Sequence, residues 1–153
     1  MRPIRHLTPL PLLALLVACT GMPTTTEDDL ADTAIPRLLG PDETLVEVQA
    51  NGAEPLRLEG RIEGYAGPAY AIRSAPGERL EITLESASDN VYFNVHDAAD
   101  GSATAVFRGE FEGRTATLTA TAPTVWLIRP FQPRASARRG ERIDFSIRIT
   151  RNG

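Results

Sequence analysis

The chain has 153 residues and a net charge of −4, and all 16 of its basic residues are arginine. It contains one cysteine and two histidines, which excludes an internal disulfide and a zinc site built from several Cys or His ligands. A net acidic chain with no basic face interleaved with aromatic residues is not typical of nucleic-acid-binding proteins, so we exclude nucleic acid as a partner. The length is sufficient for one folded domain.

Residues 1–18 have the features of a bacterial signal peptide. Arg2 and Arg5 form a short positive segment, and residues 7–18 are apolar. As a helix rising about 1.5 Å per residue, this stretch would measure roughly 18 Å, whereas a bilayer core is about 30 Å thick. We therefore predict a signal peptide that is removed, and we leave residues 1–18 out of the fold.

Residues 16–19, Leu-Val-Ala-Cys, resemble a lipobox, in which the cysteine sulfur receives a diacylglycerol before the signal is cleaved. Cys19 is the only cysteine of the chain and stands at the position that the motif requires. The alternative is an ordinary secretory signal with an unrelated cysteine. Thr20 in place of an aspartate favours the outer membrane by the sorting rule of enteric bacteria. We predict a lipid on Cys19 that anchors the protein at the outer membrane, facing the periplasm.

Residues 19–42 are predicted to be a flexible tether. Residues 24–29 are polar and acidic, with little apolar surface to bury. Residues 31–39 could form a short helical turn, but Pro36 would interrupt it. The tether would then connect Cys19 to a domain over residues 43–153.

Residues 43–153 show the period of two that is typical of β-strands. Apolar and polar residues alternate over 79–85, 91–96 and 142–150, which places one face of each strand on a core. Weaker strand signals, separated by Gly or Pro, lie at 44–49, 56–63, 69–74, 103–111, 115–121 and 124–129. This spacing predicts an all-β, antiparallel sandwich of about eight or nine strands. A barrel is the alternative that the pattern leaves open.

Catalytic constellations are scarce in this sequence. His96 is the only histidine after residue 18, and its place on the polar phase of a strand predicts a solvated residue. There is no G-x-S-x-G motif and no glycine loop for phosphates, and the acids around Asp97 and Asp100 do not have EF-hand spacing. We predict that the chain is not an enzyme and binds no cofactor and no metal.

The positive charge of the chain is concentrated at its C-terminal end. Residues 129–153 contain seven arginines and two acids, whereas residues 19–128 contain seven arginines and 18 acids. Residues 129–142 hold two prolines and a glycine and are predicted to be an exposed loop that presents Arg134, Arg138 and Arg139. Guanidinium groups suit carboxylate partners because their donors form a planar fork. The alternative is a solvated hairpin loop in an arginine-rich protein.

Several segments are similar to the periplasmic inhibitors of g-type lysozyme. The most distinctive is Val-Tyr-Phe-Asn-Val at 91–95, and others lie, in the order that the family has them, at 58–64, 70–72, 75–80, 125–129 and 143–149. The resemblance extends over residues 56–150. It implies a β-sandwich that blocks lysozyme by inserting loops into the acidic substrate cleft of the enzyme.

Part of this pattern also resembles the broader prepeptidase C-terminal type of domain, which is an accessory or binding module. The loop at 131–142 does not match the inhibitor family residue for residue, so Arg134, Arg138 and Arg139 are candidates by position and charge alone. Two hypotheses follow. The protein is a lipid-anchored lysozyme inhibitor, or it is a non-catalytic envelope module that binds glycan or another protein.

Overall fold

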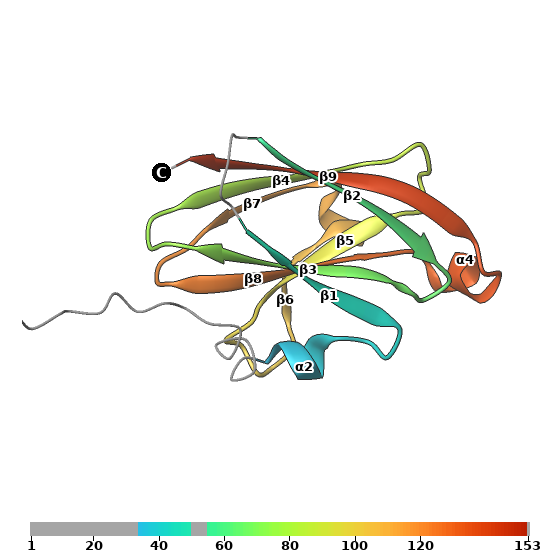
Figure 1. Cartoon of the computed structure of the whole chain (residues 1–153), viewed down its shortest axis with the longest axis horizontal. Helices are drawn as coiled ribbons and strands as arrows, with labels where there is room; N and C mark the ends of the chain where they lie inside the picture. The colour runs from blue at the N-terminus through green and yellow to red at the C-terminus, as the bar shows by residue number, and fades with distance from the viewer. Residues whose placement is uncertain (1–33, 50–54, 153) are drawn as a thin grey trace, which may run out of the picture.

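A computed structural model describes residues 34–49 and 55–152, which fold as two packed β-sheets (Figure 1). The five-stranded sheet has the order β1-β3-β8-β5-β6, and the four-stranded sheet has the order β2-β9-β4-β7. The strands are β1 Glu43–Val48, β2 Leu56–Glu63, β3 Gly67–Ser74, β4 Arg79–Glu85, β5 Tyr92–Asp97, β6 Ala105–Arg108, β7 Thr115–Thr119, β8 Thr124–Phe131 and β9 Arg142–Asn152. Short helices lie at α2 Ile35–Leu38, α3 Gly109–Glu112 and α4 Arg134–Arg138. The predicted all-β sandwich is confirmed.

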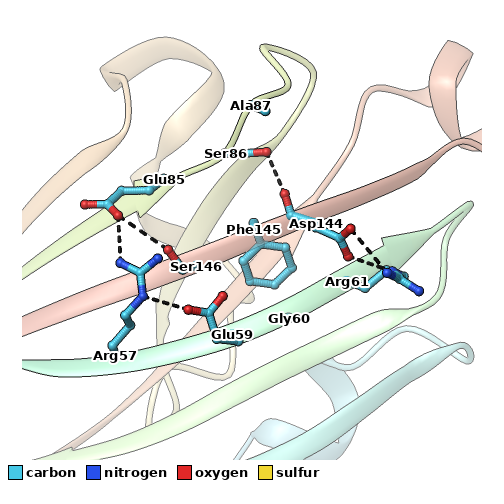
Figure 2. A pocket seen from close by; sticks show the side chains of 10 residues that line it. All are labelled: Arg57, Glu59, Gly60, Arg61, Glu85, Ser86, Ala87, Asp144, Phe145 and Ser146. Atoms are coloured by element: carbon cyan, nitrogen blue, oxygen red, sulfur yellow. Dashed lines mark hydrogen bonds and ion pairs between the residues drawn. The ribbon is translucent and has the colours of Figure 1, made fainter.

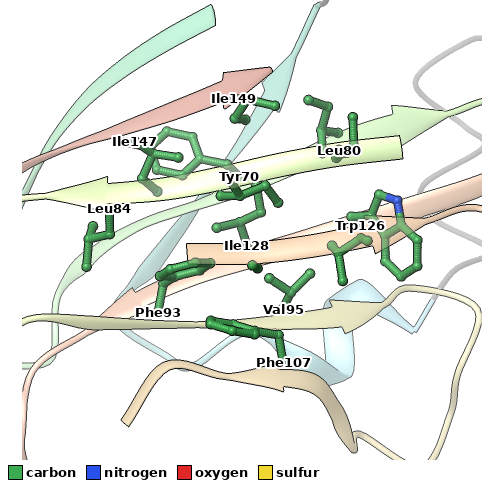
Figure 3. Close-up of a cluster of buried hydrophobic side chains, with 14 of the residues drawn as sticks. Tyr70, Leu80, Leu84, Phe93, Val95, Phe107, Trp126, Ile128, Ile147 and Ile149 are labelled. Carbon is green, nitrogen blue, oxygen red and sulfur yellow. The ribbon is translucent and has the colours of Figure 1, made fainter. Parts of the chain in front are cut away.

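The alternating residues of the strands form the core between the sheets (Figure 3). Leu80, Ile82 and Leu84 of β4 face this core, as do Ile147 and Ile149 of the neighbouring β9. Each is buried almost completely, and burying a side chain of this size contributes about 1.5–3 kcal/mol relative to leaving it exposed. The opposite sheet supplies further apolar side chains, among them Tyr70, Phe93, Val95, Phe107, Trp126 and Ile128.

Gly60 makes room for two aromatic residues of this core. A Cβ atom at Gly60 would overlap the ring of Phe145 and the hydroxyl of Tyr70. The space lets the Tyr70 hydroxyl donate a hydrogen bond to the Glu59 carbonyl, at 3.2 Å. Burial raises the pKa of Tyr70 to about 12. Glycine at position 60 is thus a packing requirement that joins the segments 58–64 and 70–72 across the two sheets.

The outer face of the five-stranded sheet carries a second, smaller apolar cluster, which α2 covers. Ile35 and Leu38 of α2 are buried against Ala69, Ala71 and Leu127. Strand β1 follows α2 and pairs in parallel with β3 along the sheet edge. Residues 34–42 fall in the predicted tether, yet these contacts make them part of the packed domain. Proline is tolerated at the start of a helix, and Pro36 stands at this position in α2.

The remaining N-terminal predictions concern the signal peptide at 1–18, the lipid on Cys19 and the tether over 19–33. All three lie outside the described residues. Within the part of the chain that the structure describes, no helix is long and apolar enough to cross a membrane.

The prediction that His96 is solvated is wrong. His96 lies on β5 opposite Leu127 and is only 6% exposed. Because Phe93 and Val95 face the main core, His96 points to the opposite face of the five-stranded sheet. This outer face is itself covered. Neither ring nitrogen makes a hydrogen bond of ordinary geometry within the described chain. Burial, and next the positive charge of Arg129, lower the pKa of His96.

Candidate partner-binding surface

The arginine-rich connection between β8 and β9 is partly helical. Pro133 precedes the single turn of α4, and the Ala137 amide donates to the Pro133 carbonyl at 2.9 Å. Ser136 and Ala137 are buried against the sandwich, so the segment is anchored and not a free loop. The prediction of a loop over 129–142 therefore needs correction, because β8 continues to Phe131 and a helical turn follows.

The structure brings the three candidate arginines together on this segment, all with exposed side chains. Arg139 turns back along the chain, where its guanidinium donates to the Glu141 carboxylate at 2.7 Å and to the Ser136 hydroxyl at 3.3 Å. The hydrogen bond from Arg139 lowers the pKa of Glu141. Arg134 and Arg138 lie one helical turn apart and form no ion pair with any described residue. These two are therefore the cations available to a partner.

An exposed tyrosine lies in the turn that contacts the α4 segment. The turn between β2 and β3 places Tyr65 at the surface with 56% of its area exposed. The preceding residue, Gly64, donates its backbone amide to the Glu141 carbonyl at 3.1 Å, which brings the turn against the segment that follows α4 (Figure 1). We call the exposed group Tyr65, Arg134, Arg138 and Arg139 the α4 surface. Tyr65 was not predicted as a site residue from the sequence, although a tyrosine in a turn between Gly64 and Gly67 is a sign of an exposed aromatic residue.

A pocket of about 380 Å³ opens next to the α4 surface. Its walls come from the β2–β3 turn, the end of β8 and the connection from α2 to β1, with the lining residues Gly40, Pro41, Asp42, Glu43, Ile62, Gly64, Tyr65, Arg129, Pro130, Phe131 and Gln132. A part-buried ion pair joins two of these walls. Arg129 donates to Glu43 at 2.7 and 3.1 Å, and their side chains are 26% and 10% exposed. Most of the other lining residues are apolar.

A second, more open hollow of about 690 Å³ lies on the outer face of the four-stranded sheet (Figure 2). Its charged side chains neutralise one another across the strands. Arg61 of β2 donates to Asp144 of β9 at 2.6 and 3.2 Å, and lowers the pKa of that carboxyl. Arg57 donates to Glu59 at 2.6 Å and to Glu85 of β4 at 2.8 Å. No unpaired cation remains among the residues that line this hollow, so we do not regard it as the binding surface.

The described residues contain no group of three or more His, Cys, Asp or Glu side chains that could hold a metal ion. The α4 surface also lacks a nucleophile with an adjacent base, because its polar groups are arginines and a tyrosine. Its chemistry is therefore that of recognition. Planar donors and an aromatic ring could contact a carboxylate-bearing surface.

Comparison with known proteins identifies the family. Neither a scan against protein-family models nor a search of curated proteins finds a match. Among solved structures, PliG of Aeromonas hydrophila, a periplasmic lysozyme inhibitor of g-type lysozyme, is 31% identical with a TM-score of 0.62. The match covers 72% of this chain and 98% of that one. The chain belongs to the PliG family.

Two further PliG structures share the fold at lower identity. PliG of Salmonella Typhimurium is 18% identical with a TM-score of 0.54, and the match covers 71% of this chain and 97% of that one. A PliG mutant from Escherichia coli is 16% identical with the same TM-score of 0.54, covering 72% and 98%. The resemblance seen in the strand segments is thereby confirmed. PliG proteins are named as inhibitors of an enzyme, which supports the prediction that this chain is not itself an enzyme.

Proposed function

We propose that this domain inhibits g-type lysozyme by placing the α4 surface in the acidic substrate cleft of the enzyme. The observation that carries the proposal is the joining of Tyr65 with two unpaired arginines at one end of a sandwich of the PliG family. Tyrosine and arginine are enriched among the residues that dominate binding energy in protein interfaces. A rigid sheet scaffold with exposed connections is a common way to present such residues.

The charges favour this orientation. Arg134 and Arg138 have no carboxylate partner among the described residues, so binding to an acidic cleft breaks no ion pair. A guanidinium donates two parallel hydrogen bonds to one carboxylate, which gives direction as well as attraction. The pocket beside Tyr65 adds a concave part to the same surface, and a protein partner can bury apolar side chains there.

Turnover of cell walls by a g-type lysozyme, measured with and without the purified protein, tests this function. We expect the rate to fall in proportion to the protein added. No inhibition at micromolar excess, with several g-type lysozymes, would contradict the proposal. In that case, binding in a glycan screen or capture of an envelope protein would support the alternative of a non-catalytic envelope module.

We also propose that the domain works in the periplasm while attached to the outer membrane by a lipid on Cys19. The PliG relatives are named as periplasmic proteins, and residues 16–19 resemble a lipobox. Mass spectrometry of the protein extracted from membranes should find acyl chains on Cys19. Cys19→Ser should appear in the soluble periplasmic fraction. A membrane-bound Cys19→Ser protein, or an unmodified Cys19, would contradict the anchor and leave the inhibitor proposal intact.

A further inference from the structure

We infer that Gln132 is a positioning residue, which fastens the β2–β3 turn to the α4 segment so that Tyr65 and the arginines meet a partner as one rigid unit. The inference rests on the proposed function, because it concerns how the same surface binds. Gln132 follows β8 and is only 6% exposed, although glutamine is a residue that usually lies at the surface.

The side-chain amide of Gln132 bridges the two connections. Its Nε2 donates to the Gly64 carbonyl at 2.8 Å and to the Glu141 carbonyl at 3.0 Å. Both amide hydrogens are therefore used, and both acceptors are backbone oxygens. A flipped amide would place its oxygen against these two carbonyls, so the hydrogen-bond pattern fixes the orientation of the side chain. One buried group thus holds the backbone of two segments that are far apart in sequence.

The two connections are also in direct contact. The Gly64 amide donates to the Glu141 carbonyl at 3.1 Å, so this carbonyl receives two hydrogen bonds. Gly64 has a φ of +60°, and a Cβ atom there would lie 3.3 Å from the Ala137 carbonyl oxygen. Glycine both adopts this backbone conformation without strain and allows the close approach. Gln132 and Gly64 together form what we call the clamp.

The clamp reaches the partner-binding residues through short backbone links. Tyr65 directly follows Gly64. On the other side, the amides of Glu141 and Arg139 both donate to the Ser136 carbonyl, at 3.3 and 3.1 Å, which ties Glu141 to the α4 turn. The position of Tyr65 relative to Arg138 is therefore set through the clamp, that is, through Gln132 and the Gly64 amide together, and not through any contact between the two side chains that the structure shows.

This arrangement has a kinetic signature. If the clamp is lost, the turn and α4 move independently, and only a fraction of the free molecules presents both in the binding arrangement. The apparent affinity falls by that fraction. The loss of affinity should appear as a slower association rate, because the contacts in the complex, and with them the dissociation rate, are unchanged. A residue that touches the partner behaves differently, since its removal mainly raises the dissociation rate.

Surface plasmon resonance on an immobilised g-type lysozyme tests the inference with Gln132→Met, which keeps the length of the side chain and removes its amide. We expect the association rate to fall by about tenfold and the dissociation rate to change by less than about twofold. Ile149→Val is the matched control, because it weakens the core far from the clamp and should leave both rates unchanged at equal protein concentration. Gly64→Ala perturbs the clamp from the other side and should reproduce the kinetic pattern.

Amide hydrogen exchange in the unbound protein gives a second measurement, which stands even if lysozyme is not the partner. The Gly64 amide should exchange faster in Gln132→Met than in the wild type, while amides of β4 and β9 should not change. Unchanged exchange at Gly64, or unchanged association by both clamp variants with a wild type that binds, would overturn the inference. A wild type that does not bind lysozyme, with faster Gly64 exchange in the variant, would contradict the proposed function and support the clamp.

Discussion

The α4 surface and the outer face of the four-stranded sheet are both rich in arginine, but they place its charge differently. On the sheet, the strand register sets Arg61 opposite Asp144 and Arg142 opposite Glu63, and Arg57 and Arg148 both pair with Glu85. On the α4 segment, Arg139 alone has an acidic partner, in Glu141. The difference teaches that the number of arginines does not mark a binding surface in this protein. The proposed surface is distinguished instead by two neighbouring arginines without an acidic partner, Arg134 and Arg138, next to an exposed aromatic turn.

The largest expected effect separates the two groups of arginines. Arg134→Ala combined with Arg138→Ala should weaken inhibition of g-type lysozyme by about 100-fold, because truncating charge pairs buried in an interface is costly. Inhibition constants from cell-wall turnover measure the loss. Arg57→Ala combined with Arg61→Ala removes the same charge from the sheet face and should inhibit like the wild type. Equal losses in the two double variants would show that net charge, not the α4 surface, governs binding.

The second prediction concerns the aromatic part of the α4 surface. Tyr65→Ala should weaken binding by about tenfold or more, as expected for a tyrosine at the centre of an interface, without lowering the stability of the free protein. The matched control is Phe111→Ala, which removes an aromatic residue that is 70% exposed on α3. Titration calorimetry with lysozyme gives both affinities. If Phe111→Ala has the larger effect, the binding surface lies at the other edge of the sandwich.

The third prediction compares how much a part-buried and an exposed ion pair contribute to the free energy of unfolding. Glu43→Ala leaves Arg129 without its partner and removes the hydrogen bond that the Gly40 amide donates to the Glu43 carboxylate at 2.6 Å. The free energy of unfolding should therefore fall by about 1–3 kcal/mol. Asp144→Ala removes an exposed partner and should cost clearly less, because solvent screens that pair. Urea denaturation of both variants measures the difference. Equal losses would mean that Glu43 and Arg129 gain nothing from their burial.

The smallest expected effect is a pH dependence. The pKa of His96 is lowered in the folded protein, so the unfolded chain binds a proton more readily. Stability should therefore decline as the pH falls below about 6.5, the ordinary value for histidine, towards the lowered pKa. Melting temperatures between pH 7.5 and 5 should fall less in His96→Gln than in the wild type. A parallel decline in both proteins would assign the pH dependence to other groups.

Much of the fold could be predicted because period-two alternation reports which residues face a core. The expected segment 79–85 is β4, and 142–150 lies within β9. Alternation cannot report what covers the other face. For this reason we expected His96 in solvent. The outer face of the five-stranded sheet is in fact covered by α2 and the residues around it in the sequence. The same limitation hid the packing of residues 34–42.

The α4 surface could be predicted only in part. Composition drew attention to Arg134, Arg138 and Arg139, since charge density is visible along the chain. That Arg139 is held by Glu141 while the other two are not depends on side-chain geometry. Tyr65 is distant in sequence, and its nearness to α4 arises from hydrogen bonds of Gly64 and Gln132. Such long-range pairings leave no local pattern to read.

The central place of β9 constrains when the molecule can fold. This strand lies between β2 and β4 and pairs with both, while eight strands precede it in the chain. The four-stranded sheet is thus incomplete until β9, the last strand of the described residues, is in place. Contacts so distant along the chain also slow folding, because a long loop has to close before they are gained. An intermediate that lacks β9 would therefore leave β2 and the β4–β7 pair with no strand to join them into one sheet.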